Sequence, residues 1–171
     1  MKIKLFTIPN LLTLSNLFCG SVAVVSALVW GDLKLAFGLM VLAAVFDFFD
    51  GFAARLLNQS SPIGLQLDSL ADDITFGLAP AAIAFSLFKE VHYPDFLQPL
   101  SGIMPYTAFL IAVFSALRLA KFNLDERQTS SFIGMPTPAN ALFWGSLTVG
   151  AHSFLPKKEF LLLYKLAASP G

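Results

Sequence analysis

The sequence predicts an all-α protein that crosses a membrane as a bundle of helices, and three observations predict it. Only 13% of the 171 residues are charged, whereas soluble domains usually carry about 25%, and the mean hydropathy is +0.72. Five apolar runs reach the length of roughly 20 residues that a membrane-spanning helix needs. Five of the eleven acidic residues crowd between positions 47 and 73, inside those runs.

The expected spans cover residues 9–30, 34–57, 64–88, 98–120 and 136–155. A sixth apolar run begins near Lys158 and is too short to cross. We therefore expect a polytopic bundle of about six transmembrane helices with the last one short or truncated. Turn residues separate the spans, and no repeat or long linker is visible, so we expect a single domain over residues 1–171.

Basic residues at the ends of the spans predict the orientation, because they favour the cytoplasmic side of a membrane. With the N-terminus inside, the cytoplasmic ends hold Lys2, Lys4, Arg55, Arg118, Lys121 and Arg127, and the outer ends hold Lys34, Lys89, Lys157 and Lys158. The net charge is zero, so no overall field suggests nucleic acid as a partner.

The acids lie at matched depths on two neighbouring spans. Asp47 and Asp50 are three residues apart, and Asp68 and Asp72 are four apart, so each pair shares one helix face. The short connection makes the two helices antiparallel neighbours, and both pairs lie on the order of 10 Å from the turn. We expect these four carboxylates to converge. Asp73 points about 100° away from Asp72 and is left out of the set.

Charges at membrane depth are expensive and usually functional. Oxygen ligands without cysteine or histidine favour Mg²⁺, Mn²⁺ or Ca²⁺ over zinc. The four acids could hold two such cations, with Asp47 and Asp68 placed to bridge them, and two cations can clamp a pyrophosphate. Arg55 can bind phosphate through its fork of N–H groups. Ion pairing with this arginine is the alternative explanation for one acid, but not for four.

Three small residues, Gly51, Ala54 and Gly64, surround the acids. They would let either a ligand or a neighbouring helix approach closely, and both interpretations stay open. Asn10 and Thr13 begin the first span, where they either cap the helix or contact a ligand. Pro9 suits the first helical turn.

The pattern Asp47-x2-Asp50-Gly51-x2-Ala54-Arg55-x8-Gly64-x3-Asp68-x3-Asp72 resembles, without gap or substitution, the signature of the CDP-alcohol phosphotransferase family. The resemblance implies a helical membrane enzyme with a bimetal site open to the cytoplasm, which displaces CMP from a CDP-linked donor by an alcohol. It implies metal ligands at Asp47, Asp50, Asp68 and Asp72. It also implies a CDP pocket at Gly51, Ala54, Arg55, Gly64 and Asp68, with Asn10 at its nucleotide end, and Asp72 as the catalytic base.

Residues 8–20, 67–81, 116–123 and 132–140 resemble the branch of this family that takes L-serine as acceptor and CDP-diacylglycerol as donor. This implies transfer of a phosphatidyl group to the serine hydroxyl with Mg²⁺ or Mn²⁺, yielding phosphatidylserine and CMP in phospholipid biosynthesis. It also implies a bacterial cell membrane as the location and a homodimer as a common assembly.

The acceptor would lie near Arg118, Lys121 and Asn123, at the end of the fourth span. The two basic residues could instead be membrane-interface anchors. A sibling enzyme that uses glycerol 3-phosphate or inositol is the first alternative function. A cation transporter would explain the acids but should show inverted repeats, and none is visible. An isoprenoid-diphosphate transferase also uses pairs of aspartates, which match this spacing less well.

Overall fold

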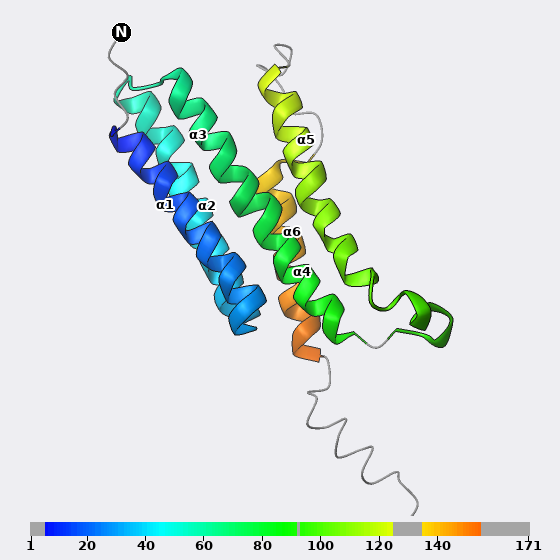
Figure 1. Ribbon diagram of the computed structural model, residues 1–171. Coiled ribbons are helices and arrows are strands. Elements are labelled where there is room, and N and C mark those ends of the chain that lie inside the picture. The colour runs from blue at the N-terminus through cyan, green and yellow to red at the C-terminus, as the bar shows by residue number, and fades with distance from the viewer. Residues whose placement is uncertain (1–5, 92, 125–134, 155–171) are drawn as a thin grey trace, which may run out of the picture.

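The computed structural model describes residues 6–91, 93–124 and 135–154, and these ranges contain helices and turns without a strand. The helices pack side by side as a bundle (Figure 1). Their bounds are α1 Ile8–Val25, η1 Ser26–Trp30, α2 Leu33–Leu56, α3 Pro62–Asp72, η2 Asp73–Leu78, α4 Ala79–Glu90, η3 Asp95–Leu100, η4 Met104–Phe109, α5 Leu110–Leu124 and α6 Thr137–Phe154.

Four helices in the described ranges are long and apolar enough to cross a membrane. They are Ile8–Trp30, Leu33–Leu56, Pro62–Glu90 and Met104–Leu124. The first four expected spans are therefore found, and the third runs without a break through α3, η2 and α4. The fourth begins later than expected, because Pro99 and Gly102 fall in the short helix η3 and the turn that follows it.

The fifth expected span forms the 18-residue helix α6. It is not among the four helices apolar enough to span a membrane, because polar residues such as Asn140 and His152 interrupt it. The sixth expected run, from Lys158, lies outside the described residues. The described part of the chain is thus a polytopic membrane bundle, as the composition predicts.

Local signals place the helix ends around the acids. Ser61 caps α3 by accepting a hydrogen bond from the backbone nitrogen of Gly64, and Pro62 occupies the first turn, where its missing N–H is not needed. Asn58, with a φ of 51°, helps to reverse the chain after α2. The connection of five residues, 57–61, reverses the chain so that α3 runs antiparallel to α2, and both helices pack on α1.

The bundle packs through small side chains. Ala23, Ala36, Ala43 and Ala79 are fully buried, and small residues let membrane helices approach closely. Figure 1 shows α1 and α2 side by side, α5 on the opposite side, and α3 with α4 between them. The start of α1, the turn between α2 and α3, and the end of α5 all lie at one end of the bundle. We call it the acid end, because Asp50 lies six residues before the end of α2 and Asp68 six residues after the start of α3.

Candidate active site

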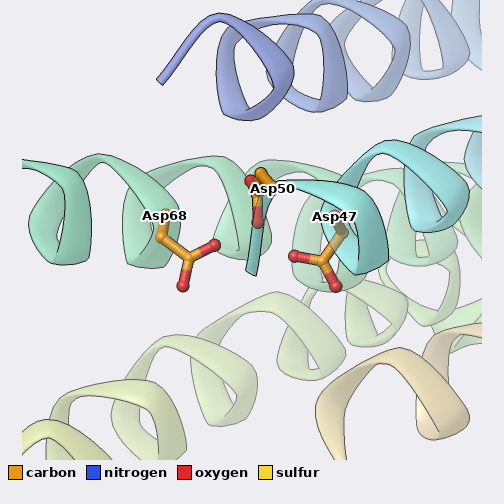
Figure 2. A group of neighbouring side chains, drawn as sticks. All are labelled: Asp47, Asp50 and Asp68. Atoms are coloured by element: carbon orange, nitrogen blue, oxygen red, sulfur yellow. The ribbon is translucent and has the colours of Figure 1, made fainter. Parts of the chain in front are cut away.

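Three carboxylates from two helices converge near the acid end. One oxygen each of Asp47 and Asp50 on α2 and Asp68 on α3 lies within 4.8 Å of the others. Figure 2 shows Asp47 and Asp68 pointing into the same space, with Asp50 between them in this view. The packing of α2 and α3 on α1 and the three-residue spacing of Asp47 and Asp50 produce this arrangement, so the expected convergence is found for these three residues.

Asp72 lies one helical turn beyond Asp68 and outside the group that meets within 4.8 Å. Its Oδ1 accepts a hydrogen bond of 3.4 Å from Nδ2 of Asn16. Asp72 therefore lies beside the cluster of three acids but does not belong to it. Asp73 points elsewhere, as expected: its Oδ1 is buried near Gly77 and has no hydrogen-bond partner among the described residues.

Helix α1 supplies polar groups to the acids. The hydroxyl of Thr13 lies 2.6 Å from Oδ2 of Asp50, to which it donates, and 3.1 Å from the backbone oxygen of Pro9. Asn10, Thr13 and Asn16 are 4%, 3% and 0% exposed. The sequence identifies the first two as possible ligand contacts but does not identify Asn16. The signal that could have found it is a polar residue every third position along an apolar helix, which marks a single face.

No arginine or lysine among the described residues forms an ion pair with the clustered acids. Arg55, the cation nearest in sequence, is exposed near the end of α2. Asp50 is buried, and Asp47 and Asp68 are half-buried. Taking carboxylates out of water without a positive partner is costly, and all the ligand atoms offered here are oxygens. The donor set therefore fits a hard divalent cation such as Mg²⁺ or Mn²⁺.

A cavity of about 160 Å³ adjoins the cluster. Four of the residues expected to contact a nucleotide line it, namely Asn10, Ala54, Gly64 and Asp68. A Cβ atom on Gly64 would lie 3.1 Å from both Oδ1 of Asn10 and Oγ of Ser61, so glycine leaves room that a side chain would fill. Gly51 and Arg55 do not line this cavity, but a Cβ atom on Gly51 would meet nothing within 4 Å, which shows open space beside it.

The three residues expected at the acceptor site have different surroundings. Arg118 donates a hydrogen bond of 3.0 Å from Nη1 to Oγ1 of Thr137, and both line a cavity of about 620 Å³ between α4, α5 and α6. Asn123 donates to Oγ of Ser69 over 2.8 Å, which ties α5 to α3 one residue beyond Asp68. Lys121 is exposed and does not line the cavity.

A family model described as CDP-alcohol phosphatidyltransferase matches residues 6–168. The CDP-diacylglycerol–serine O-phosphatidyltransferase of Bacillus subtilis is 38% identical over 131 residues, which cover 77% of this chain and 69% of that protein. The proteins of the same name from Helicobacter pylori strain 26695 and Methanocaldococcus jannaschii are 37% and 32% identical, over 81% and 95% of this chain and 55% and 71% of their own lengths.

The match spans nearly the whole chain and includes both acid-bearing helices, α2 and α3. The chain therefore belongs to the CDP-alcohol phosphatidyltransferase family.

Proposed function

We propose that this protein transfers the phosphatidyl group of CDP-diacylglycerol to the hydroxyl of L-serine, which yields phosphatidylserine and CMP. The observation that carries the proposal is the convergence of Asp47, Asp50 and Asp68 beside a cavity at one end of an apolar bundle. The similar proteins named above are CDP-diacylglycerol–serine O-phosphatidyltransferases, which supports serine as the acceptor. Family membership favours a transferase over the cation transporter considered from the sequence.

In this proposal, Asp47, Asp50, Asp68 and Asp72 hold two divalent cations, Mg²⁺ or Mn²⁺. Bound there, the cations would neutralise the pyrophosphate of the donor and stabilise its attacking and leaving oxygens. Thr13 supports this role because its hydroxyl holds one oxygen of Asp50 and so limits the rotation of that carboxylate.

The donor would bind with its cytidine end in the cavity lined by Asn10, Ala54 and Gly64, and beside the open space at Gly51. Arg55, exposed near the turn after α2, would approach the donor phosphates. The acyl chains would remain among the apolar side chains of the bundle and the surrounding lipid.

Asp72 would act as the general base. It accepts the proton of the serine hydroxyl while the hydroxyl oxygen attacks the phosphorus that carries diacylglycerol, and the bond to the bridging oxygen of CMP breaks. Arg118 and Thr137, paired over 3.0 Å, would offer donors to the serine carboxylate. We propose that Lys121 and Asn123 act near this acceptor site. We also propose that the acid end faces the cytoplasm of a bacterial cell.

The test is a transfer assay with the purified protein, CDP-diacylglycerol, labelled serine and either Mg²⁺ or Mn²⁺. We expect labelled lipid and CMP in equal amounts, both lost on chelation and restored by either cation. Glycerol 3-phosphate and inositol tested in parallel identify a sibling enzyme if one of them, and not serine, releases CMP. Absence of labelled lipid from serine would overturn the serine assignment.

A further inference from the structure

A chain of hydrogen bonds runs from η2 through α1 to Asp72. The hydroxyl of Thr75 donates to Oδ1 of Asn16 over 2.8 Å, and Nδ2 of Asn16 donates to Oδ1 of Asp72 over 3.4 Å. Asn16 and Thr75 are both 0% exposed. Neither residue belongs to the spaced pattern of aspartates and small residues between Asp47 and Asp72. Neither carries a carboxylate that could bind a metal.

The chemistry of the three side chains decides which group donates and which accepts in each of these hydrogen bonds. An ionised carboxylate only accepts hydrogen bonds, so the amide of Asn16 must turn its nitrogen toward Asp72. Its oxygen then faces Thr75, whose hydroxyl can donate to it. The same hydroxyl lies 3.3 Å from the backbone oxygen of Asn16, so Thr75 is held against α1 by two acceptors of one residue.

The backbone is shaped to permit this contact. The π-helical segment η2 begins at Asp73, directly after Asp72, and such segments often occur at functional sites. A Cβ atom on Gly20 would collide with the hydroxyl of Thr75 and lie 2.9 Å from its Cα. Glycine at this position of α1 therefore allows η2 to approach closely enough for Thr75 to reach Asn16.

We propose that Asn16 and Thr75 are positioning residues that fix the orientation of the Asp72 carboxylate for its reaction with the acceptor hydroxyl. The inference rests on the proposed function, in which Asp72 is the base. Thr75 sets the amide of Asn16, and Asn16 holds one oxygen of Asp72, so the carboxyl group cannot rotate freely. Asn16 acts through the Asp72 carboxylate and Thr75 acts through Asn16, so neither is proposed to contact the substrate, which distinguishes them from a catalytic residue.

The experiment compares Asn16→Ala, Thr75→Val and Thr75→Ser with the wild-type protein in the transfer assay. We expect Asn16→Ala to lower kcat roughly 10- to 100-fold, the usual cost of removing a group that orients a site carboxylate. Thr75→Val should lower kcat roughly threefold to tenfold, as for the loss of one neutral hydrogen bond. KM for CDP-diacylglycerol should stay within about twofold because the donor pocket is untouched.

Thr75→Ser retains the hydroxyl and should restore most of kcat, which a purely structural role of the Thr75 methyl group would not produce. Ser21→Ala is the matched control, since the Ser21 hydroxyl is exposed and bonds only the backbone of its own helix. Asn16→Asp keeps the size of the side chain, removes the amide donor and should lower kcat as Asn16→Ala does. It replaces Asn16→Ala in the comparison if that variant does not fold.

Unchanged kcat in the Asn16 and Thr75→Val variants would overturn the inference, as would a loss confined to KM. So would a Thr75→Ser variant no more active than Thr75→Val. Failure of the proposed function looks different, because it is seen in the wild-type protein as missing phosphatidylserine. In that case the variants are compared with whichever acceptor alcohol releases CMP.

Discussion

At the acid end of the bundle, Asp47, Asp50 and Asp68 meet within 4.8 Å and have no ion-pair partner among the described residues. At the opposite end, Glu90 lies 3.2 Å from Nε2 of His152, and both side chains are more than one third exposed. Lys89 at that end lies over the ring of Phe85, 5.7 Å from its centroid. The charged groups at this opposite end thus have interaction partners and partial exposure to solvent. The clustered acids lack a cationic partner within the described part of the chain.

These two ends show how functional charges in a membrane protein can be distinguished from anchoring charges. Exposed ion pairs contribute little to stability and are expected wherever helices leave a membrane. Buried carboxylates oriented by hydroxyl and amide groups from another helix are costly unless a ligand compensates them. Substitutions at the two ends of the bundle should therefore differ strongly in their effect on transfer.

The largest effect is expected at the acid cluster itself. Asp68→Asn keeps the shape of the side chain but removes a charge, so metal-supported transfer should fall about 10³-fold, equivalent to several kcal/mol of transition-state stabilisation. The measurement is kcat/KM for CMP release. Glu90→Gln removes a carboxylate at the far end and is the matched control. Comparable losses in the two variants would erase the proposed contrast between the ends.

The support of Asp50 by α1 should have an intermediate effect. Thr13→Val keeps the side-chain shape and removes the hydroxyl that lies 2.6 Å from Asp50. Loss of such a supporting group typically weakens metal binding roughly 10- to 100-fold, so more Mn²⁺ should be needed for half-maximal activity. Ser15→Ala, which removes a hydroxyl bonded only to the backbone of the same helix, should leave the Mn²⁺ requirement unchanged. An unchanged requirement in Thr13→Val would show that Thr13 serves packing alone.

Alanine substitutions of Gly51 and Gly64 should distinguish space that the donor occupies from space that neighbouring side chains limit. Gly51→Ala meets no atom within 4 Å and should raise helix stability by about 0.5–1 kcal/mol, yet raise KM for CDP-diacylglycerol if the donor occupies that space. Gly64→Ala crowds Asn10 and Ser61 at 3.1 Å and should raise KM roughly fivefold, because overpacking costs about 1 kcal/mol or more. Thermal unfolding and KM check both. A stabilised Gly51→Ala variant with unchanged KM would place the donor elsewhere.

The smallest effect is expected at the far end. Glu90→Gln removes the partner of His152 and should change the free energy of unfolding by less than about 1 kcal/mol, since both side chains are partly exposed. Transfer activity should stay within about twofold of wild type. Denaturant or thermal unfolding in detergent measures the first, and the transfer assay the second. A tenfold loss of activity would mean that this end also contributes to the reaction.

The parts of the site that can be predicted from the sequence are those that depend on local helix geometry. Asp47 and Asp50 share a face because they are three residues apart, and the short turn at 57–61 sets Asp68 at the same depth. These relations depend only on the rise and rotation of a helix, so no distant contact is needed to predict them. The apolar runs likewise predict the four spanning helices, with errors confined to their ends and to the less apolar α6.

The residues that support the acids are known only from the packing of the helices. Thr13 is separated from Asp50 by 37 positions, and Asn16 from Asp72 by 56. Their contacts depend on which face of α1 packs against α2 and α3, and this is set by close approaches such as that of Gly20 to Thr75. The helices, their spacing and the shared faces of the acids can be predicted from the sequence alone, because helix periodicity is local. The orientation of α1 comes from packing between distant segments, and so do the hydrogen bonds that hold the acids in place.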